Sequence, residues 1–288
     1  MPNYPLRLAT HFSTLAPDYD VVLCDVWGVV HNGVTAFAEA GAALTRFRAQ
    51  GGSVILITNA PRPADVVVGL LDHLAFPREA YDAVVTSGDV TRTIIAARAG
   101  QSAFHIGPAR DVPIFDGLDT KLVPLERADY VVCSGLYDDT VETPQDYEGL
   151  IAQLRARGLT MLCANPDLVV ERGDKLVYCA GAIADLYAAA GGEVIFAGKP
   201  YRPIYEQARA TARALRGPQR ASERLLAIGD SGRTDLAGAA VFGIDCLFVT
   251  GGIHAEELGR GALDAGALAD MFAAADSVPK AVTPRLVW

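Results

Sequence analysis

Residues 20–30 read DVVLCDVWGVV, an apolar run that stops at an acid. Positions 21–24 are Val, Val, Leu and Cys, without the alternation of a half-exposed strand. Such continuous apolar character is typical of a strand that is buried on both faces of a parallel sheet. Open α/β sheets bind their ligands beyond the carboxyl ends of the strands. Asp25 closes this predicted strand, so it is the first candidate residue for chemistry.

The same pattern recurs along the chain, which predicts an α/β fold with a parallel, doubly wound sheet. Seven further apolar runs end in small or polar residues, at 52–59, 104–107, 129–135, 159–165, 193–199, 225–230 and 245–252. Apolar positions at three-to-four spacing predict helices between them, at 36–48, 143–157, 182–190 and 202–215. The final stretch PKAVTPRLVW is expected to wrap loosely over the surface.

The composition indicates a protein that binds small molecules. The 288 residues, 51% of them hydrophobic, suit two modest domains better than one. Because no apolar run reaches the roughly 18 residues of a membrane span and no signal-like leader is seen, a cytoplasmic protein is expected. The net charge of −9, without a Lys/Arg cluster, argues against nucleic acid or a membrane as partner. The five widely spaced cysteines predict buried, reduced thiols.

Polar residues close other predicted strands in an order that suggests one site. Thr58-Asn59, Lys199 and Asp230 each end such a run, and Asp235 follows about one helical turn later. Taken singly, an Asp after a strand is more often a helix cap or turn residue, and a Gly-Lys-Pro sequence is an ordinary loop. Their joint occurrence at strand ends makes a common active site the better interpretation.

These residue types suit phosphoryl transfer, which needs an in-line nucleophile, cations near the phosphate oxygens and positioned donors. Asp25 is the predicted nucleophile, which would form an aspartyl-phosphate. Mg²⁺ prefers oxygen ligands in octahedral geometry and keeps several waters. Asp25, the backbone carbonyl of Trp27, and Asp230 are therefore the predicted metal ligands.

Further residues have predicted roles around this centre. The Thr58 hydroxyl would donate to a phosphate oxygen, and Lys199 would offset the negative charge of the carboxylates and phosphate. Together with the nucleophile, these two residues form the predicted catalytic set. Asp235 would support the metal site from behind the ligands. Asn59, next to the hydroxyl residue, is expected to bind substrate.

Four short motifs together resemble those of the haloacid dehalogenase superfamily. They read DVWGVV at 25–30, ITNA at 57–60, GKP at 198–200 and GDSGRTDLAGA at 229–239. Other stretches are similar to its class IIA branch, which contains nucleotide and pyridoxal-phosphate phosphatases. These stretches lie at 84–91, 163–170 and 178–187. The resemblance covers nearly the whole chain, and the DVWGV sequence suggests a distinct subgroup of that branch.

The class IIA resemblance implies a cap domain inserted into a Rossmann-like core. The core would comprise residues 1–86 and 198–288, and an α/β cap over residues 87–197 would set substrate choice. Asn165 and Asp167, in an Asn-Pro-Asp sequence of the cap, are expected to face the substrate, although the same sequence is a good turn. Homodimerisation through the cap is also implied by the resemblance alone.

Trp27 occupies the position at which the phosphatases that this chain resembles carry a second Asp. That Asp protonates the leaving group and then activates the hydrolytic water. Indole can do neither, and losing a general acid/base removes about a factor of 10²–10⁴ in rate. Three outcomes are open: a slow phosphatase, a leaving group that departs unaided, or a replacement acid. His31 is the nearest candidate acid, and simple solvent exposure is its alternative interpretation.

The sequence leaves three functions open. The first is a Mg²⁺-dependent phosphatase of a small phosphorylated metabolite, such as a sugar phosphate or a nucleoside monophosphate, acting through phospho-Asp25. The second is a non-catalytic binder of a phosphorylated metabolite, which the replacement at Trp27 favours and the retained nucleophile disfavours. The third is a dehalogenase, which would not need the Asp230/Asp235 pair. A dinucleotide-binding dehydrogenase is disfavoured because no G-x-G-x-x-G sequence follows a strand.

Overall fold

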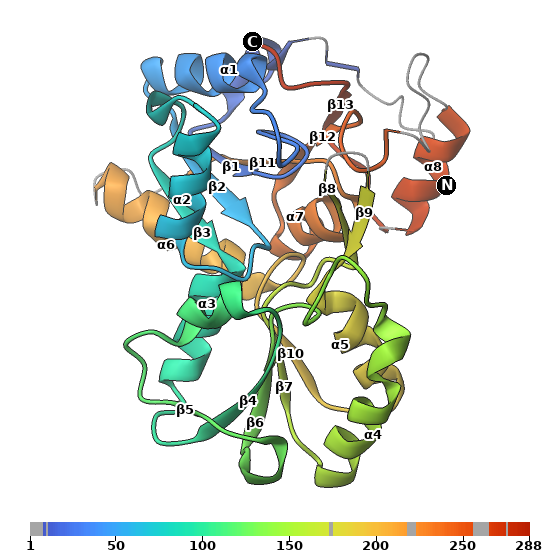
Figure 1. Ribbon diagram of the computed structural model, residues 1–288. Helices are drawn as coiled ribbons and strands as arrows, with labels where there is room; N and C mark the ends of the chain where they lie inside the picture. Colours follow the sequence, from blue (N-terminus) through green and yellow to red (C-terminus); the bar gives the residue numbers. More distant parts are fainter. Residues whose placement is uncertain (1–7, 10, 173–174, 218–222, 256–264, 275) are drawn as a thin grey trace. The chain divides into compact units, whose positions relative to one another are not determined.

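The computed structural model describes residues 8–9, 11–172, 175–217, 223–255, 265–274 and 276–288 (Figure 1). The chain forms two compact units. The first consists of Met1–Thr58, Val68–Val85 and Tyr205–Trp288, and the second of Asn59–Val67 and Thr86–Ile204. Each unit has its own sheet and its own hydrophobic core.

The first unit is built on a six-stranded sheet with the order β13-β12-β11-β1-β2-β3. Its strands are β1 (Val21–Asp25), β2 (Ser53–Thr58), β3 (Ala83–Thr86), β11 (Leu225–Gly229), β12 (Asp245–Val249) and β13 (Ala281–Thr283). Strand β1 lies between β11 and β2 and is parallel to both, with Cys24 opposite Ile228 and Asp25 opposite Ile57. This register brings the ends of the three strands to the same edge of the sheet.

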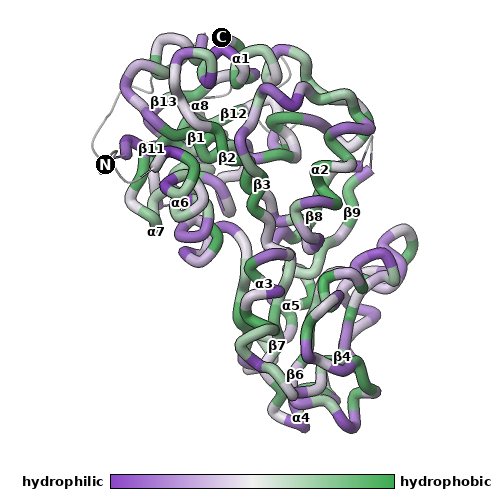
Figure 2. Tube along the Cα trace, turned by 90° about the vertical axis from the view of Figure 1, so that its left-hand side faces the viewer, coloured by the Kyte–Doolittle hydropathy of each residue, from purple (hydrophilic) through white to green (hydrophobic). Residues whose placement is uncertain are grey.

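Helices cover the sheet of the first unit. They are α1 (Ala38–Ala49), α2 (Ala64–His73), α6 (Arg202–Arg216), α7 (Ala237–Phe242) and α8 (Ala265–Ala274). Short turns complete the unit: η1 (Phe12–Thr14), η2 (Ala16–Asp18), η3 (Arg78–Ala80) and the π-helical η7 (Gly232–Leu236). On one face, Leu236 and Phe272 pack against Phe248 of β12. All residues of β1 and β2 are buried, and the tube along these strands is hydrophobic in Figure 2.

The second unit has a five-stranded sheet with the order β10-β7-β6-β4-β5, and the pairs between neighbouring strands are parallel. Its strands are β4 (Ser102–Ile106), β5 (Lys121–Leu122), β6 (Tyr130–Cys133), β7 (Met161–Cys163) and β10 (Val194–Phe196). An antiparallel pair, β8 (Val169–Arg172) and β9 (Lys175–Tyr178), forms a separate two-stranded sheet.

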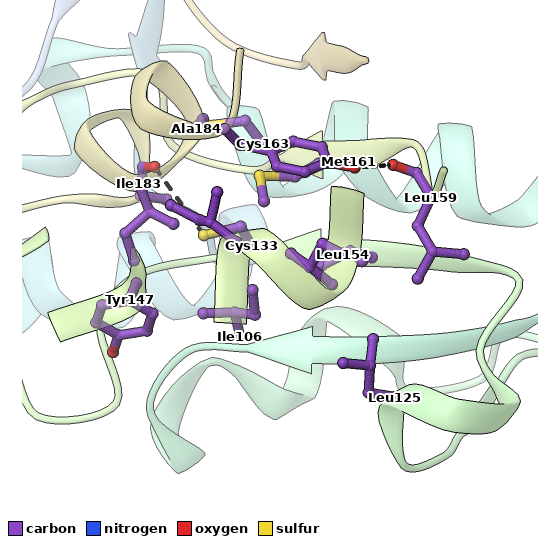
Figure 3. Close-up of a cluster of buried hydrophobic side chains, with 14 of the residues drawn as sticks. Ile106, Leu125, Cys133, Tyr147, Leu154, Leu159, Met161, Cys163, Ile183 and Ala184 are labelled. Carbon is purple, nitrogen blue, oxygen red and sulfur yellow. Dashed lines mark hydrogen bonds between the residues drawn. The ribbon is translucent and has the colours of Figure 1, made fainter. Parts of the chain in front are cut away.

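Helices cover both faces of this second sheet. They are α3 (Ser87–Ala96), α4 (Glu148–Arg157) and α5 (Ala180–Ala189), with 3-10 turns η4 (Ala109–Phe115), η5 (Leu125–Arg127) and η6 (Pro144–Tyr147). Residues of α4 and α5, including Leu154 and Ile183, pack against Cys133 and Met161 (Figure 3). On the opposite face, α3 and η4 contribute Ile95 and other apolar residues to a second cluster.

The expected α/β class is confirmed, and every predicted strand and helix has a counterpart. The prediction for the chain end was wrong, because Ala281 and Val282 are fully buried in β13 and β13 pairs with β12. The five cysteines are free and buried, as expected. Among the described residues, no helix is long and apolar enough to cross a membrane.

The two units resemble, but do not match, the expected domains. Segments 59–67 and 198–204 cluster with the second unit rather than with the first. Hydrogen bonds explain this grouping: Asn59 bonds to the backbone of Lys199, and Arg62 bonds to Asp111. The division into a catalytic core and a substrate-selecting cap stays a prediction.

Candidate active site

Asp25 is the last residue of β1 and keeps only 7% of its surface exposed. Its Oδ1 accepts a hydrogen bond from the backbone N–H of Val26 at 2.7 Å. The carboxylate is therefore held at the carboxyl edge of the sheet, between the ends of β2 and β11. A carboxylate that is fixed in this way has little conformational entropy to lose when it attacks an electrophile.

Asp230 follows β11 directly and is 4% exposed. Its Oδ2 accepts the backbone N–H of Ile253 at 2.7 Å. Two glycines press against this carboxylate, because a Cβ at Gly28 or at Gly252 would lie 1.9 Å from its Oδ2. Any larger residue at either position would have to displace the carboxylate. Backbone from two separate loops thus shapes the pocket of Asp230.

Asp235 lies in the π-helical turn η7 and is 2% exposed. Its Oδ2 accepts the backbone N–H of Ser231 at 3.1 Å. Gly229 makes room for it, since a Cβ there would lie 2.1 Å from the Asp235 Cγ. The turn therefore directs this carboxylate back toward the end of β11.

The three carboxylates of Asp25, Asp230 and Asp235 form one buried cluster, in which one oxygen of each lies within 4.8 Å of the others. Like charges at this spacing repel one another, so a bound cation is favoured electrostatically. Hard carboxylate oxygens are the ligands that divalent cations such as Mg²⁺ and Ca²⁺ prefer. The residues present thus fit a divalent metal ion. The structure confirms that Asp25 and Asp230 lie together, and it brings Asp235 into the same cluster.

Thr58 and Lys199 are both buried, at 6% and 2% exposure. Thr58 ends β2 in the first unit, whereas Lys199 belongs to the second unit. The backbone N–H of Lys199 donates to Asn59 Oδ1 at 2.7 Å, and Asn59 Nδ2 donates to the Lys199 carbonyl at 3.1 Å. The side-chain amide of Asn59 is thereby engaged in holding this loop. The catalytic roles of Thr58 and Lys199 and the substrate contact of Asn59 stay predictions.

Asn165 and Asp167 stabilise the loop after β7. Asn165 Oδ1 accepts the backbone N–H of Asp167 at 3.0 Å, which is the hydrogen bond of an Asx turn. Asp167 Oδ1 in turn accepts from Asn59 Nδ2 at 2.9 Å. The turn interpretation of the Asn-Pro-Asp sequence is therefore satisfied by the geometry. A substrate-facing role of either residue stays a prediction.

Trp27 is partly buried and is held by the loop that follows it. Its ring meets that of His31 edge to face, with 5.0 Å between the ring centroids. At Gly33, where φ is +84°, a Cβ would lie 2.6 Å from Trp27 Cη2 and Cζ2. The glycine therefore lets the backbone pack directly on the indole.

His31 is not the exposed loop residue that one interpretation of the sequence expected. It is 1% exposed, and its Nδ1 accepts the backbone N–H of Gly33 at 2.8 Å. Burial lowers the pKa of His31 to about 4, so its imidazole is neutral near pH 7. A neutral imidazole with such a pKa is a poor match for a general acid at that pH. The geometry gives no support to the replacement-acid hypothesis.

Comparison with known proteins identifies the family. Two family models match, one described as haloacid dehalogenase-like hydrolase over residues 22–121 and one as HAD-like hydrolase over residues 196–275. A crystal structure of a haloacid dehalogenase-like hydrolase from Brucella suis is 48% identical and has a TM-score of 0.87. The match covers 97% of this chain and 100% of that chain. This chain belongs to the haloacid dehalogenase-like hydrolases.

Other members of the haloacid dehalogenase-like family have named activities. D-glycerol 3-phosphate phosphatase from Mycobacterium tuberculosis is 29% identical over 247 residues, and this chain spans 65% of its length. Crystal structures of glycerol phosphate phosphatase from the same organism, with calcium and with magnesium, have TM-scores of 0.63 and 0.64 at 26% identity. They match 83% of this chain and 68% and 70% of their own chains. The class IIA branch is confirmed, and the DVWGV subgroup stays a prediction.

Sequence reasoning missed the residues that shape the pocket of Asp230. Gly252 and Ile253 follow β12, and Gly28 follows Trp27. A signal was present in the two glycines that close the apolar run at 245–252. Paired glycines at a strand end indicate close approach of the backbone to another group. They do not show which group approaches.

Proposed function

We propose that this haloacid dehalogenase-like hydrolase is a Mg²⁺-dependent phosphatase of a small phosphorylated metabolite. The observation that carries the proposal is the buried cluster of Asp25, Asp230 and Asp235, with Asp25 at the end of the central strand. The phosphatases among the relatives support a phosphoric monoester as substrate. Candidate substrates are sugar phosphates, nucleoside monophosphates and, from the named relative, glycerol phosphate.

In this proposal Asp25 attacks the phosphorus, the bond from phosphorus to the leaving oxygen breaks, and water later hydrolyses phospho-Asp25. Asp25, the Trp27 carbonyl and Asp230 would hold Mg²⁺, with Asp235 supporting them. The ion would neutralise charge on the phosphoryl oxygens. Thr58 would donate to a phosphoryl oxygen, and Lys199 would contribute positive charge.

Residues 87–197 are the proposed cap, in which residues such as Asn165 and Asp167 would select the substrate. A cap that selects while the core performs the chemistry would let one core serve many substrates. A homodimer formed through the cap and a cytoplasmic location complete the proposal.

The test is phosphate release from a panel of small phosphoesters, including p-nitrophenyl phosphate, in Mg²⁺ or in EDTA. Wild type should release phosphate only with the metal, and Asp25→Asn should lose turnover while it stays folded by circular dichroism. Asp230→Asn should mainly raise the Mg²⁺ concentration that is needed. The exposed Asp119 gives a matched control, because Asp119→Asn should behave as wild type. A folded Asp25→Asn variant with full activity would exclude the mechanism.

A non-catalytic binder of a phosphorylated metabolite is the second candidate, because Trp27 takes the place of the general acid/base. It predicts that wild type binds phosphoesters with Mg²⁺ but releases no phosphate. Turnover in Trp27→Asp, with none in wild type, would favour this candidate.

A further inference from the structure

Asn59 uses both hydrogen-bond donors of its side chain within the protein. Its Nδ2 donates to the backbone carbonyl of Lys199 at 3.1 Å and to Asp167 Oδ1 at 2.9 Å. Its Oδ1 accepts the backbone N–H of Lys199 at 2.7 Å. A side-chain amide has two N–H donors and one carbonyl oxygen, so these partners also fix which end is nitrogen. Phosphoryl oxygens are acceptors, and this amide has no donor left for them.

The Asn59 amide holds the main chain of Lys199 from both of its polar groups. One side chain binds the N–H and the carbonyl of the same residue, as the partner in an antiparallel strand pair does. Both residues are 2% exposed, so water does not compete for these bonds. Gly198 allows the close approach, since a Cβ there would lie 2.3 Å from Asn59 Oδ1. The backbone that carries the lysine side chain is therefore fixed.

Asp167 supports the amide of Asn59 from the turn after β7. Its backbone N–H donates to Asn165 Oδ1 at 3.0 Å, and its carbonyl accepts the N–H of Gly181 in α5 at 3.1 Å. A Cβ at Gly181 would lie 2.5 Å from that carbonyl oxygen, so the helix packs closely on the turn. All of these residues belong to the second unit. Hydrogen bonds thus run continuously from α5 through the turn and Asn59 to Lys199.

We infer that Asn59 is a positioning residue, which places Lys199 for phosphoryl transfer and is itself supported by Asp167; this inference rests on the proposed phosphatase function. Lysine carries its charge on a flexible four-carbon stem, so the ammonium group is only as well placed as the backbone beneath it. A displacement of about 1 Å can cost on the order of 10²-fold in rate. Asn59 therefore acts on the reaction through Lys199, and not by touching the substrate.

The first test exchanges the partners of the hydrogen bond between Asn59 and Asp167. Asn59→Asp sets two carboxylates against each other and removes the donor to the Lys199 carbonyl. With p-nitrophenyl phosphate and Mg²⁺, kcat should fall by about 10²-fold, and KM should change less than kcat. Asp167→Asn keeps an oxygen acceptor and should cost less. The double variant restores a donor and an acceptor and should recover much of the loss. A double variant no faster than Asn59→Asp would overturn the inference.

The second test asks whether Asn59 acts through the lysine. Asn59→Ala should lower kcat in wild type but change it little in Lys199→Met, where the ammonium group is already absent. Gly198→Ala, which displaces Asn59 Oδ1, should follow the same pattern. Gln153→Ala removes an exposed amide side chain on α4 and is the matched control, which should follow wild type. Losses that multiply in Lys199→Met would show direct action of Asn59 and would contradict the positioning role.

The third measurement does not need turnover. The chain has four lysines, so ¹⁵N-lysine labelling gives four backbone amide signals, and Lys199→Arg identifies the one of interest. The Lys199 amide should exchange slowly with D₂O in wild type and much faster in Asn59→Ala. The Lys280 amide, which donates to the Cys246 carbonyl at 2.8 Å, is the internal control and should exchange equally in both proteins. Equal exchange of the Lys199 amide in the two proteins would contradict the inference.

These measurements separate the positioning role from the proposed function. Asp25-dependent turnover in wild type, combined with a Lys199 amide that Asn59→Ala does not affect, contradicts the positioning role and leaves the phosphatase intact. A wild type that releases no phosphate, while the Lys199 amide loses its protection in Asn59→Ala, contradicts the phosphatase and supports the anchoring of the lysine. Circular dichroism of each variant shows that the comparison is made between folded proteins.

Discussion

The Asp230 carboxylate accepts the backbone N–H of Ile253 at 2.7 Å. The residue before Ile253 is Gly252, and a Cβ added there would lie 1.9 Å from the same Oδ2. The loop after β12 therefore both donates a hydrogen bond to the Asp230 carboxylate and limits the space around it. This arrangement makes the position of a proposed metal ligand depend on a residue without a side chain.

Gly252→Ala should weaken metal binding. Its Cβ would lie 1.9 Å from Asp230 Oδ2, so the carboxylate must shift away from the cluster. Changes behind a metal ligand typically cost about 10–100-fold in affinity. Calorimetric titration with Mg²⁺ or Mn²⁺ measures the loss. Gly69→Ala, in the exposed face of α2 with nothing near its Cβ, is the control and should stabilise the fold by about 1 kcal/mol.

Wild type should show a burst of p-nitrophenolate close to one equivalent per enzyme, followed by slow turnover. The departing p-nitrophenolate needs no proton, whereas the attack of water on phospho-Asp25 lacks the base that an Asp at position 27 would provide. Stopped-flow absorbance measures both phases. Trp27→Asp should speed the slow phase. A linear time course in wild type would contradict the prediction.

The free energy of unfolding should fall as pH drops from about 6.5 toward 4. Burial lowers the pKa of His31 to about 4, so in this range the unfolded chain binds a proton that the folded chain does not. The contribution of this one group is on the order of 3 kcal/mol and is fully present above pH 6.5. Urea titrations at several pH values measure it.

Comparison with variants isolates the His31 contribution from that of the carboxylates. His31→Gln should show a smaller decrease across this pH range. His73→Gln, which changes an exposed histidine at the end of α2, should keep the decrease of wild type. Equal slopes in wild type and His31→Gln would refute the prediction.

All five cysteines should resist a thiol reagent in the folded protein. They are buried, and burial raises the pKa of Cys133 to about 12 and that of Cys163 above its usual value. The reactive thiolate is therefore both scarce and inaccessible. Reaction with Ellman's reagent should be slow in buffer and should release five equivalents in guanidinium chloride. Rapid reaction in buffer would show that a thiol is accessible.

The sequence was sufficient for the parts of the fold and site that follow from local pattern. Continuous apolar runs predicted the central strands, and their last residues predicted Asp25 and Asp230, because parallel strands end at one edge of a sheet. Strand β13 was missed because three residues are too few to show a periodic pattern of hydrophobic residues. Its burial comes from β12 and from the helices around it.

Other features depend on contacts between distant segments, which no local pattern contains. The burial of His31 results from the folding of the 31–36 loop onto Trp27. The glycines around Asp230 come from two loops more than two hundred residues apart in the chain. Residues 59–67 cluster with the second unit, although the segments before and after them belong to the first, because Asn59 donates a hydrogen bond to Asp167.

The packing of Gly33 on Trp27 links two positions in evolution. No side chain fits at position 33 while an indole occupies position 27, so the glycine has to arise before the tryptophan or together with it. In a homologue that carries Asp at position 27 the indole no longer restricts position 33, and only the positive φ of this position still favours glycine. Among relatives, tryptophan at position 27 should therefore always be accompanied by glycine at position 33. An alignment in which these two positions vary independently would show that the loop can repack.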